Sequence, residues 1–389
     1  MCLRVGIIGV GNIGSMHLNN FINGNIKNAR VTALCDIDSR NLYRLKDKLP
    51  EDMKYFDNAT DLIKSGCVDG ILIATPHYDH PIIAIEALEA GLHVFCEKPA
   101  GVYTKNVRQM NEVAKKSGKV FAINFVLRLN NYYKKIKEMI DAGELGRVKR
   151  VTWIITNWYR TQTYFERGGW RASWAGEGGG TLLNQNPHQL DLLQWITGMP
   201  KRVRATCYFG KYRDVEVEDE ATAYFEYEDG SVATYITSVS EFPGTNRLEI
   251  AGDRGKIVYE DDKITFTRTT VPEPEFNKTT DTSFGPIPVW KCDVEASPVD
   301  LNDCQAAMVS NWAGAALGKE ELIAPGYEGI KSLSLSNAIY LSAWNDNWVE
   351  FPFDEDEFLD KLNEKIKNST YVKKTIEGGV EDLNASFHK

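Results

Sequence analysis

The sequence predicts an α/β protein in two parts: a doubly wound parallel sheet, then an α+β part with a large open, mainly antiparallel sheet. Over residues 1–125, continuous apolar runs alternate with helical segments, which is typical of parallel strands joined by right-handed crossovers. Over residues 126–389, short segments alternate apolar and polar residues between Asp- and Gly-containing turns, which indicates antiparallel strands. We therefore place a domain boundary between residues 125 and 126.

The composition is that of a globular protein and argues against several other classes. The 389 residues are 43% hydrophobic and 25% charged, which is enough to bury two cores. The net charge of −9 and the lack of a basic block argue against a nucleic-acid partner, and no apolar run is long enough to span a membrane. Seven scattered cysteines without CxxC spacing favour a reducing cytoplasm and no metal site. We expect no signal peptide, because the chain opens into a strand.

Each element of the first part follows from its apolar pattern and its boundary residues. Strands are expected over residues 3–10, 30–36, 68–74, 94–96 and 119–123. Helices are expected between them, over residues 15–23, 61–65, 81–90 and 104–117. Since a helix separates most consecutive strands, these strands can be parallel neighbours.

The second part begins with a helix expected over residues 130–143 and continues as a sheet. Strands are expected over residues 148–158, 204–209, 221–227, 231–240, 248–251, 256–259 and 264–267. A partner or a helix layer must cover the open face of such a sheet. Residues 270–298, rich in Pro, Thr and charge, are expected to form a long loop that rims the site or an interface, and the acids at 354–357 to begin a helix.

A glycine-rich turn follows the first strand and has the form G-x-G-x-x-G. In this pattern the first glycine permits a tight turn, the second lets the backbone approach a pyrophosphate, and the third lets the helix pack against the strand. The N–H groups at the start of the helix then face the phosphates. We therefore expect a dinucleotide to be bound by the turn residues Gly9, Gly11, Asn12, Ile13 and Gly14.

Asp36 ends the second strand, at about the 20-residue distance from the glycines that is expected of a ribose-binding acid. Its carboxylate would accept hydrogen bonds from a ribose diol and repel a 2′-phosphate, so NAD is favoured over NADP. Ile37 and Arg40 follow in the same turn and are included among the cofactor-binding residues. Arg40 is also placed to meet a 2′-phosphate, which keeps NADP as the lesser alternative.

Lys98 lies where the strand over residues 94–96 ends, between Glu97 and Pro99. Proline cannot extend the hydrogen-bond ladder and biases the preceding residue toward extended geometry, which holds Lys98 at the carboxyl end of the strand. Ligands bind at that edge of open α/β sheets. We expect Glu97 and Lys98 to meet the cofactor and the reacting group, although a solvated turn is the commoner fate of such a pair.

The third strand is followed by further candidates near the cofactor. Thr75 and Pro76 come directly after it, and His77 and His80 come shortly after them. Thr75, Pro76 and His80 are included among the cofactor-binding residues. For both histidines, a helix start or a packing position is the commoner alternative.

Together these motifs resemble the glucose–fructose oxidoreductase/inositol dehydrogenase/MocA (Gfo/Idh/MocA) family. The resemblance rests on the glycine turn, Thr75-Pro76, Glu97-Lys98-Pro99 and a later stretch similar to the family's GGG-x-L-x-D-x-G-x-H-x-x-D. That stretch runs from Gly178-Gly179-Gly180 through Asn184 and His188 to Asp191. The resemblance covers essentially the whole chain, including a helix over residues 328–344.

The resemblance implies a Rossmann domain over residues 1–125 and, over residues 126–389, a domain that binds the substrate and forms the oligomer, a homodimer or homotetramer through the open sheet. It also implies NAD(P)-dependent oxidation or reduction of sugars and polyols. The Lys-Pro bond is often cis in the family, which would aim the lysine at the nicotinamide. The sequence departs from the family pattern at Asn184, which stands where the family has an acid. In this respect the chain resembles a subgroup that includes nucleotide-sugar 3-dehydrogenases.

If residues 181–197 form one helix, Asn184, His188 and Asp191 lie on one face of it. We interpret His188 as the proton acceptor, Lys98 as the group that stabilises the alkoxide, and Asn184 as a positioning residue. The Trp170-Arg171 pair resembles a cofactor contact of the family. The residues expected to bind the substrate are Lys98, Arg128, Trp158, Tyr159, Asn184 and His188.

The predicted function is hydride transfer between NAD and a hydroxyl or keto carbon of a sugar, polyol or glycoside, with C3 favoured. One alternative is a redox-neutral, glycoside-cleaving enzyme that retains its NAD. A second, of another class, is a non-catalytic protein that senses NAD. The presence of both Lys98 and His188 places that second alternative last.

Overall fold

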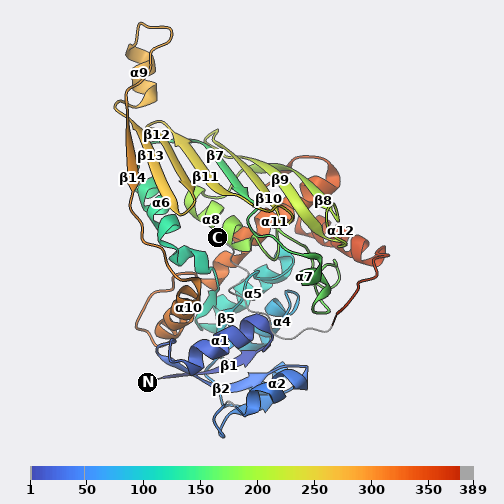
Figure 1. Ribbon diagram of the computed structural model, residues 1–389. Coiled ribbons are helices and arrows are strands. Elements are labelled where there is room, and N and C mark those ends of the chain that lie inside the picture. The colour runs from blue at the N-terminus through green and yellow to red at the C-terminus, as the bar shows by residue number, and fades with distance from the viewer. Residues whose placement is uncertain (1, 48, 377–389) are drawn as a thin grey trace.

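The computed structural model describes residues 2–47 and 49–376, which form two sheets with helices between and around them (Figure 1). The first sheet is parallel and has the order β3-β2-β1-β4-β5-β6. Its strands are β1 (Leu3–Ile8), β2 (Ala29–Cys35), β3 (Lys54–Phe56), β4 (Gly70–Ile73), β5 (His93–Cys96) and β6 (Phe121–Ile123). This order is that of a Rossmann fold, so the predicted doubly wound sheet is confirmed.

Helices connect these strands because each strand is buried on both faces and must be covered twice. They are α1 (Asn12–Ile22), α2 (Ser39–Lys46), α3 (Ala59–Lys64), α4 (Asp79–Glu89) and α5 (Thr104–Ser117). The sequence did not predict β3 or α2. β3 has only three residues, and α2 buries a single one, Leu42, so neither carries a clear periodic signal.

The second sheet is mixed and has the order β14-β13-β12-β11-β7-β10-β9-β8-β15. Its strands are β7 (Val148–Ile155), β8 (Arg202–Phe209), β9 (Glu218–Glu226), β10 (Val232–Ser238), β11 (Asn246–Gly252), β12 (Gly255–Glu260), β13 (Lys263–Thr269), β14 (Val289–Val294) and β15 (Val349–Glu350). Every pairing is antiparallel except that of β7 with β10. The mainly antiparallel sheet is therefore confirmed, with one parallel pair at its centre.

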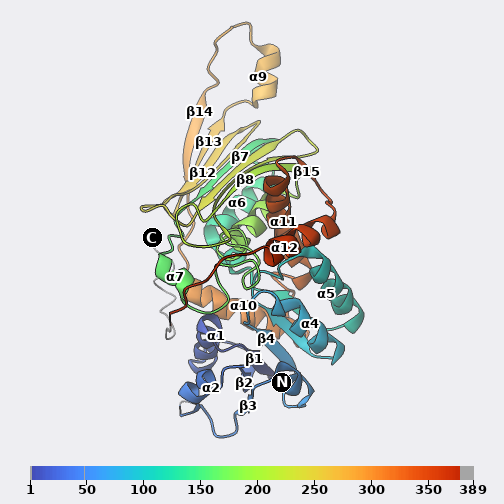
Figure 2. The same ribbon diagram turned by 90° about the vertical axis from the view of Figure 1, so that its right-hand side faces the viewer.

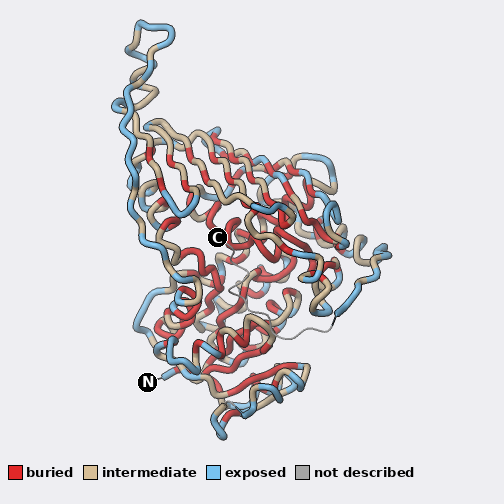
Figure 3. The backbone as a smooth tube through the Cα atoms, viewed as in Figure 1, coloured by how far each residue is buried: buried red, intermediate tan, exposed pale blue. Residues whose placement is uncertain are grey.

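Helices cover one face of this sheet, and the buried residues lie between the two (Figures 2 and 3). The covering helices are α6 (Asn131–Asp141), α8 (Pro187–Thr197), α11 (Gly329–Asn345) and α12 (Glu355–Lys367). Inward residues such as Val151, Trp153 and Ile155 alternate with more accessible ones along β7. Of the described helices, none is both long and apolar enough to cross a bilayer.

The stretch 270–298 is more ordered than the expected long loop, because it contains α9 (Glu273–Thr279) and β14. Together they form an arm that extends away from the rest of the molecule (Figure 1). β14 pairs only with β13, and most of its side chains are exposed, including Trp290. Because both faces of β14 are exposed to solvent, the strand needs no alternation of apolar and polar residues. That alternation is the pattern from which a strand is predicted, so β14 was not predicted.

The chain crosses back to the first sheet in α10 (Leu301–Ala316), which the sequence did not predict. Trp312 of α10 packs on Phe95 of β5 with ring centroids 5.8 Å apart, and the Asn124 amide donates to Gln305 at 2.5 Å. A late segment therefore completes the cover of the first sheet.

Arg128, in the 3-10 helix η1 (Val126–Leu129), ties α8 to the segment that follows β6. Its Nε and Nη2 donate to Asp191 of α8 at 2.7 and 2.6 Å, and its Nη1 donates to Glu328. Arg128 is 3% exposed and Asp191 is fully buried. Because the buried charges are paired and hydrogen-bonded, the network is tolerated inside the fold.

Replacing Asp191 by alanine would leave Arg128 with one carboxylate partner inside the protein. Breaking a buried pair costs about 3–5 kcal/mol, so we expect D191A to lower the free energy of unfolding by that amount in urea denaturation. As a control, K105A removes the exposed pair with Asp356 and should change the free energy of unfolding by less than about 1 kcal/mol. Equal effects of the two substitutions would contradict a structural role for the network.

Candidate active site

The glycine turn after β1 has the geometry that a dinucleotide requires. Gly9 has φ +90°, a conformation that favours glycine, and a Cβ there would lie 2.7 Å from the Ala74 carbonyl oxygen. A Cβ at Gly14 would lie 1.9 Å from the Gly9 carbonyl oxygen, so only glycine allows α1 to approach the turn. A Cβ at Gly11 would meet nothing within 4 Å, which leaves the backbone open to a ligand. The three glycines therefore fit the three predicted roles.

The start of α1 is suited to bind an anion. Gly11 is the N-cap and offers no side-chain cap, and the first turn of the helix contains no acidic residue. Asn12 and Ile13 are the first residues of the helix. The backbone N–H groups of a first helical turn and the positive end of the helix dipole favour phosphate at this position.

Asp36 lies beside this turn at the end of β2. Its carboxylate accepts hydrogen bonds from the backbone N–H groups of Val10 (2.8 Å) and Asp38 (2.9 Å), and the side chain is nearly buried. Ile37 is 93% exposed at the mouth of the turn. Arg40 pairs with Asp38, the N-cap of α2, at 2.8 Å. A fixed carboxylate next to a cation already paired with an acid favours a ribose diol over a 2′-phosphate.

Lys98 lies at the carboxyl end of β5, and the Lys98–Pro99 peptide bond is cis. Its Nζ donates to the backbone carbonyl of Asn184 at 2.7 Å. Burial lowers the pKa of the Lys98 ammonium, and the neighbouring carboxylate of Glu97 opposes that shift. One contact thus joins the edge of the parallel sheet to the segment before α8.

Glu97 is oriented into the fold. Its Oε1 accepts hydrogen bonds from His17 Nε2 and Asn124 Nδ2, both at 2.7 Å, and the residue is 4% exposed. Burial alone would raise the pKa of this carboxyl, but these donors and the Lys98 ammonium hold it below its ordinary value. Glu97 therefore contributes a buried negative charge beneath Lys98.

The histidines after β4 join backbone segments around the site. The His80 ring lies 2.7 Å from the Pro99 carbonyl oxygen and 2.8 Å from that of Thr75, and burial lowers its pKa. Neutral imidazole can donate to only one of these two carbonyl groups. His77 Nδ1 lies 3.0 Å from the Glu177 carbonyl oxygen, and its ring packs on Trp170. His80 thereby holds the turn at Thr75-Pro76 against the cis peptide.

The predicted helix over residues 181–197 is wrong in its first turns, because α8 begins at Pro187. Residues before a proline are disfavoured in helical geometry, and proline itself suits the first helical position. The segment before it forms turns, with the Asn184 N–H donating to the Gly180 carbonyl at 2.8 Å. Asn184 therefore lies outside the helix, and its backbone carbonyl, rather than its side chain, meets Lys98.

The side chain of Asn184 binds a buried carboxylate that the sequence analysis did not single out. Asn184 Nδ2 donates to Glu177 Oε1 at 2.5 Å, and the Ala172 N–H donates to Glu177 Oε2 at 2.7 Å. Glu177 is fully buried, and burial raises its pKa. Its place directly before the three glycines is the signal that would have pointed to it.

A second buried carboxylate fixes the glycine run itself. Glu218 of β9 accepts hydrogen bonds from the backbone N–H groups of Gly180 (2.9 Å) and Leu182 (2.7 Å). Burial raises the pKa of Glu218 to about 7. The approach is close, since a Cβ at Gly180 would lie 2.1 Å from the Glu218 carbonyl oxygen.

His188 is the second residue of α8 and is 7% exposed. Burial and the Lys98 ammonium together lower its pKa to about 3 against the opposing charge of Glu97, so the ring is neutral at physiological pH. Its Nδ1 is buried and has no hydrogen-bond partner among the described residues. Asp191, one turn later, pairs with Arg128, whose guanidinium donates to Asp191 and Glu328.

Aromatic and cationic side chains gather on the segment around α7 (Gln162–Glu166). The guanidinium of Arg160 lies 5.5 Å from the Trp158 ring and 5.2 Å from the Tyr164 ring. The guanidinium of Arg171 lies 4.6 Å from the Tyr164 ring and 4.7 Å from the Trp170 ring. Tyr159 lies farther out, against Phe242 and Arg213. Tyr164 was not among the predicted site residues.

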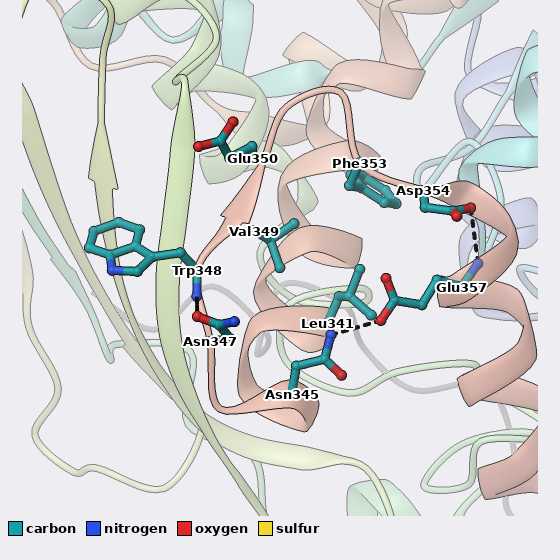
Figure 4. Close-up of a pocket in the computed structure, with 9 residues that line it drawn as sticks. All are labelled: Leu341, Asn345, Asn347, Trp348, Val349, Glu350, Phe353, Asp354 and Glu357. Atoms are coloured by element: carbon teal, nitrogen blue, oxygen red, sulfur yellow. Dashed lines mark hydrogen bonds between the residues drawn. The ribbon is translucent and has the colours of Figure 1, made fainter.

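A hollow of about 290 Å³ lies elsewhere, where α11, β15 and α12 meet (Figure 4). It is lined by residues such as Asn345, Trp348 and Glu357, and by none of the site residues described above. We therefore build the candidate site on the sheet edge and not on this hollow.

Comparison with known proteins agrees with both halves of the fold. Residues 3–125 match the model of an oxidoreductase family with an NAD-binding Rossmann fold, and residues 133–258 match that of the GFO/IDH/MocA C-terminal domain. The WlbA dehydrogenase from Bordetella pertussis, solved with NADH and UDP-GlcNAcA, is 25% identical, with a TM-score of 0.77 over 91% of this chain and 100% of that one.

Two curated relatives are inositol dehydrogenases. The inositol 2-dehydrogenase of Salmonella typhimurium is 34% identical over 148 residues, 38% of this chain, and the match spans only 44% of that protein. The myo-inositol 2-dehydrogenase of Thermotoga maritima is 28% identical over 265 residues, which is 66% of this chain and 74% of that protein.

Alanine substitutions at Gly11 and Gly14 should have different effects, the first on NAD binding and the second on stability. We expect G11A to weaken NAD binding at least about tenfold, a loss of ~1.4 kcal/mol, because the added methyl group occupies the space of a pyrophosphate. Its stability should change by less than about 1 kcal/mol, since the Cβ meets nothing. G14A should instead lower the free energy of unfolding by about 1–3 kcal/mol through overpacking. Fluorescence titration with NADH and urea denaturation measure the two effects, and an unchanged NADH affinity in G11A would contradict the assigned cofactor site.

Proposed function

Because the chain belongs to the Gfo/Idh/MocA family of NAD-binding oxidoreductases, we propose that it transfers a hydride between NAD and a hydroxyl or keto carbon of a carbohydrate-type substrate. The observation that carries this proposal is the 2.7 Å contact of Lys98 Nζ with the Asn184 carbonyl. The contact supports the proposal because it joins the edge of the parallel sheet to the segment before α8, and the Lys98 ammonium also acts on the His188 ring of that helix.

When bound, the nicotinamide supplies the hydride chemistry, and this chain supplies positioning and electrostatics. Gly11 and the start of α1 would hold the pyrophosphate, and Asp36 the ribose diol. Lys98 has three N–H donors, of which one is directed to Asn184. The remaining donors bind the substrate oxygen and stabilise the negative charge that develops when its proton leaves.

His188 contributes a neutral ring next to Lys98. Its burial and its position at the positive end of α8 both disfavour the imidazolium form. In this state the ring orients the substrate hydroxyl through its lone pair or its N–H group. Asn184 supports this geometry, because its carbonyl binds Lys98 and its amide binds Glu177.

For the substrate we propose a cyclic polyol, a sugar or a glycoside, with C3 of a pyranose ring as the reacting carbon. The support is that the relatives are named for inositol and that the WlbA dehydrogenase was solved with a nucleotide sugar. Trp158 and Tyr159 add ring faces that can pack on the C–H face of a sugar. A primary isotope effect with C3-deuterated substrate tests whether C3 is the carbon that exchanges the hydride.

We further propose that the domains divide between residues 125 and 126 and that the open face of the second sheet forms a homodimer or homotetramer. The support is that the described helices cover only one face of that sheet. A cytoplasmic location is proposed from the seven cysteines, all of which are unpaired. Analytical ultracentrifugation of the full chain measures the oligomeric state.

The direct test is the absorbance of reduced nicotinamide, measured with NAD and separately with NADP across polyols, free sugars, glycosides and nucleotide sugars. We expect turnover with NAD and one of these classes. K98M should lower kcat by about 10²–10³, because it removes the charge while keeping the side-chain length. K105A, on the exposed face of α5, should leave kcat unchanged.

Other outcomes would favour the alternatives. Glycoside cleavage without net NADH, by protein that retains its NAD, would replace the dehydrogenase with a redox-neutral enzyme. NAD binding without turnover of any class would favour an NAD-sensing protein.

A further inference from the structure

The proposed reaction needs a group that takes the proton of the substrate hydroxyl, and His188 is poorly suited to hold it. The ring is buried beside the Lys98 ammonium, and its pKa lies near 3. The carboxylate that would stabilise an imidazolium is absent at residue 184, where an asparagine contributes only an amide. A second proton acceptor is therefore to be sought among the neighbouring side chains.

Tyr164 of α7 offers such an acceptor. Its phenolic oxygen accepts a hydrogen bond from Gln185 Nε2 at 3.1 Å and lies 3.4 Å from Asn184 Nδ2. Both amide groups are donors, and donors aimed at an oxygen favour its ionised form. Among the described residues no group accepts a hydrogen bond from this hydroxyl, so its own hydrogen-bonding direction remains available to a substrate.

The cations around Tyr164 also favour the ionised form of its hydroxyl. Arg160 precedes α7 and Arg171 follows it, with guanidinium carbons 5.2 and 4.6 Å from the centre of the tyrosine ring. The Lys98 ammonium, at the end of β5, also lowers the pKa of Tyr164, and the carboxylate of Glu177 opposes the cations. Burial alone would raise the pKa of Tyr164, but the three cations hold it below its ordinary value.

We propose that Tyr164 is a further catalytic residue, whose phenolate oxygen takes the proton of the substrate hydroxyl while Lys98 holds the substrate oxygen. The O–H bond breaks and its proton passes to Tyr164. The C–H bond breaks with its electron pair, which passes as hydride to oxidised NAD, and the C=O bond forms. In the reverse direction Tyr164 returns the proton. The proposal rests on the dehydrogenase function proposed above.

The test compares wild type, Y164F and the control Y212F, each as the full chain with NAD present. Tyr212 is a matched control, because its ring also lies near a cation, 4.8 Å from the Lys211 ammonium. Unlike Tyr164, it is 50% exposed and is not one of the proposed site residues. We measure tyrosinate absorbance against pH, NADH affinity, and the pH dependence of kcat and kcat/KM.

We expect the tyrosinate absorbance of the wild type to include one tyrosine with a pKa below the ordinary value of about 10. Y164F should remove the absorbance change of that tyrosine, and Y212F should keep it. Y164F should keep its NADH affinity within about twofold while kcat falls about 10²-fold or more, the size of a lost general base. The rise of kcat/KM with pH that accompanies ionisation of Tyr164 should disappear in Y164F.

Three results would overturn the proposal: no tyrosine signal that Y164F removes, an unchanged kcat and pH profile in Y164F, or a higher KM alone. The last would make Tyr164 a binding contact. If wild type reduces no NAD with any substrate class, the dehydrogenase function fails. The tyrosinate titration separates the two failures, because it detects the ionisation of Tyr164 without turnover.

Discussion

The hydrogen bond from Lys98 to the Asn184 carbonyl is the contact on which the site depends. The two residues are 86 positions apart, one just after β5 and the other in the turn before α8, so the site exists only where these segments meet. Placing an ammonium group in this interface is costly, as the lowered pKa of Lys98 shows. The carbonyl and the buried charge of Glu97 offset that cost and leave the lysine oriented toward the cofactor edge.

Around this contact, buried carboxylates hold segments that lack regular secondary structure. Glu97 receives donors from α1 and the end of β6, Glu177 from residues 172 and 184, and Glu218 from the glycine run. A buried carboxylate without donors would be prohibitively unfavourable, so each one fixes the groups that donate to it. In this way hydrogen bonds to buried carboxylates position turns between residues 172 and 186, whose backbone does not form a helix.

The candidate site contains residues of two kinds, those that would bind the cofactor and those that would act on the substrate. Gly9, Gly11, Gly14 and Asp36 act through the backbone and one fixed carboxylate, and they belong to a single β-α-β unit. The proton and alkoxide chemistry draws on Lys98, His188 and Tyr164, which the fold gathers from β5, α8 and α7. The cationic surroundings of Tyr164 and the low pKa of His188 follow from the same packing. Burial and the Lys98 ammonium favour neutral imidazole, whereas the cations around Tyr164 favour ionised phenol against the effect of its burial.

The sequence by itself determined the parallel sheet, the cofactor turn and the position of Lys98, because strand periodicity, glycine spacing and a proline stop are local signals. The helix over 104–117 was predicted to the residue for this reason. It could not determine that Pro187 starts α8 and leaves Asn184 in a turn, that residues 270–298 contain α9 and β14, or that α10 returns to the first sheet. Only the tertiary structure decided that Arg128 pairs with Asp191, 63 positions away, and that Tyr164 lies between two guanidinium groups. Those outcomes depend on which distant side chains share one buried space, and no local pattern records that.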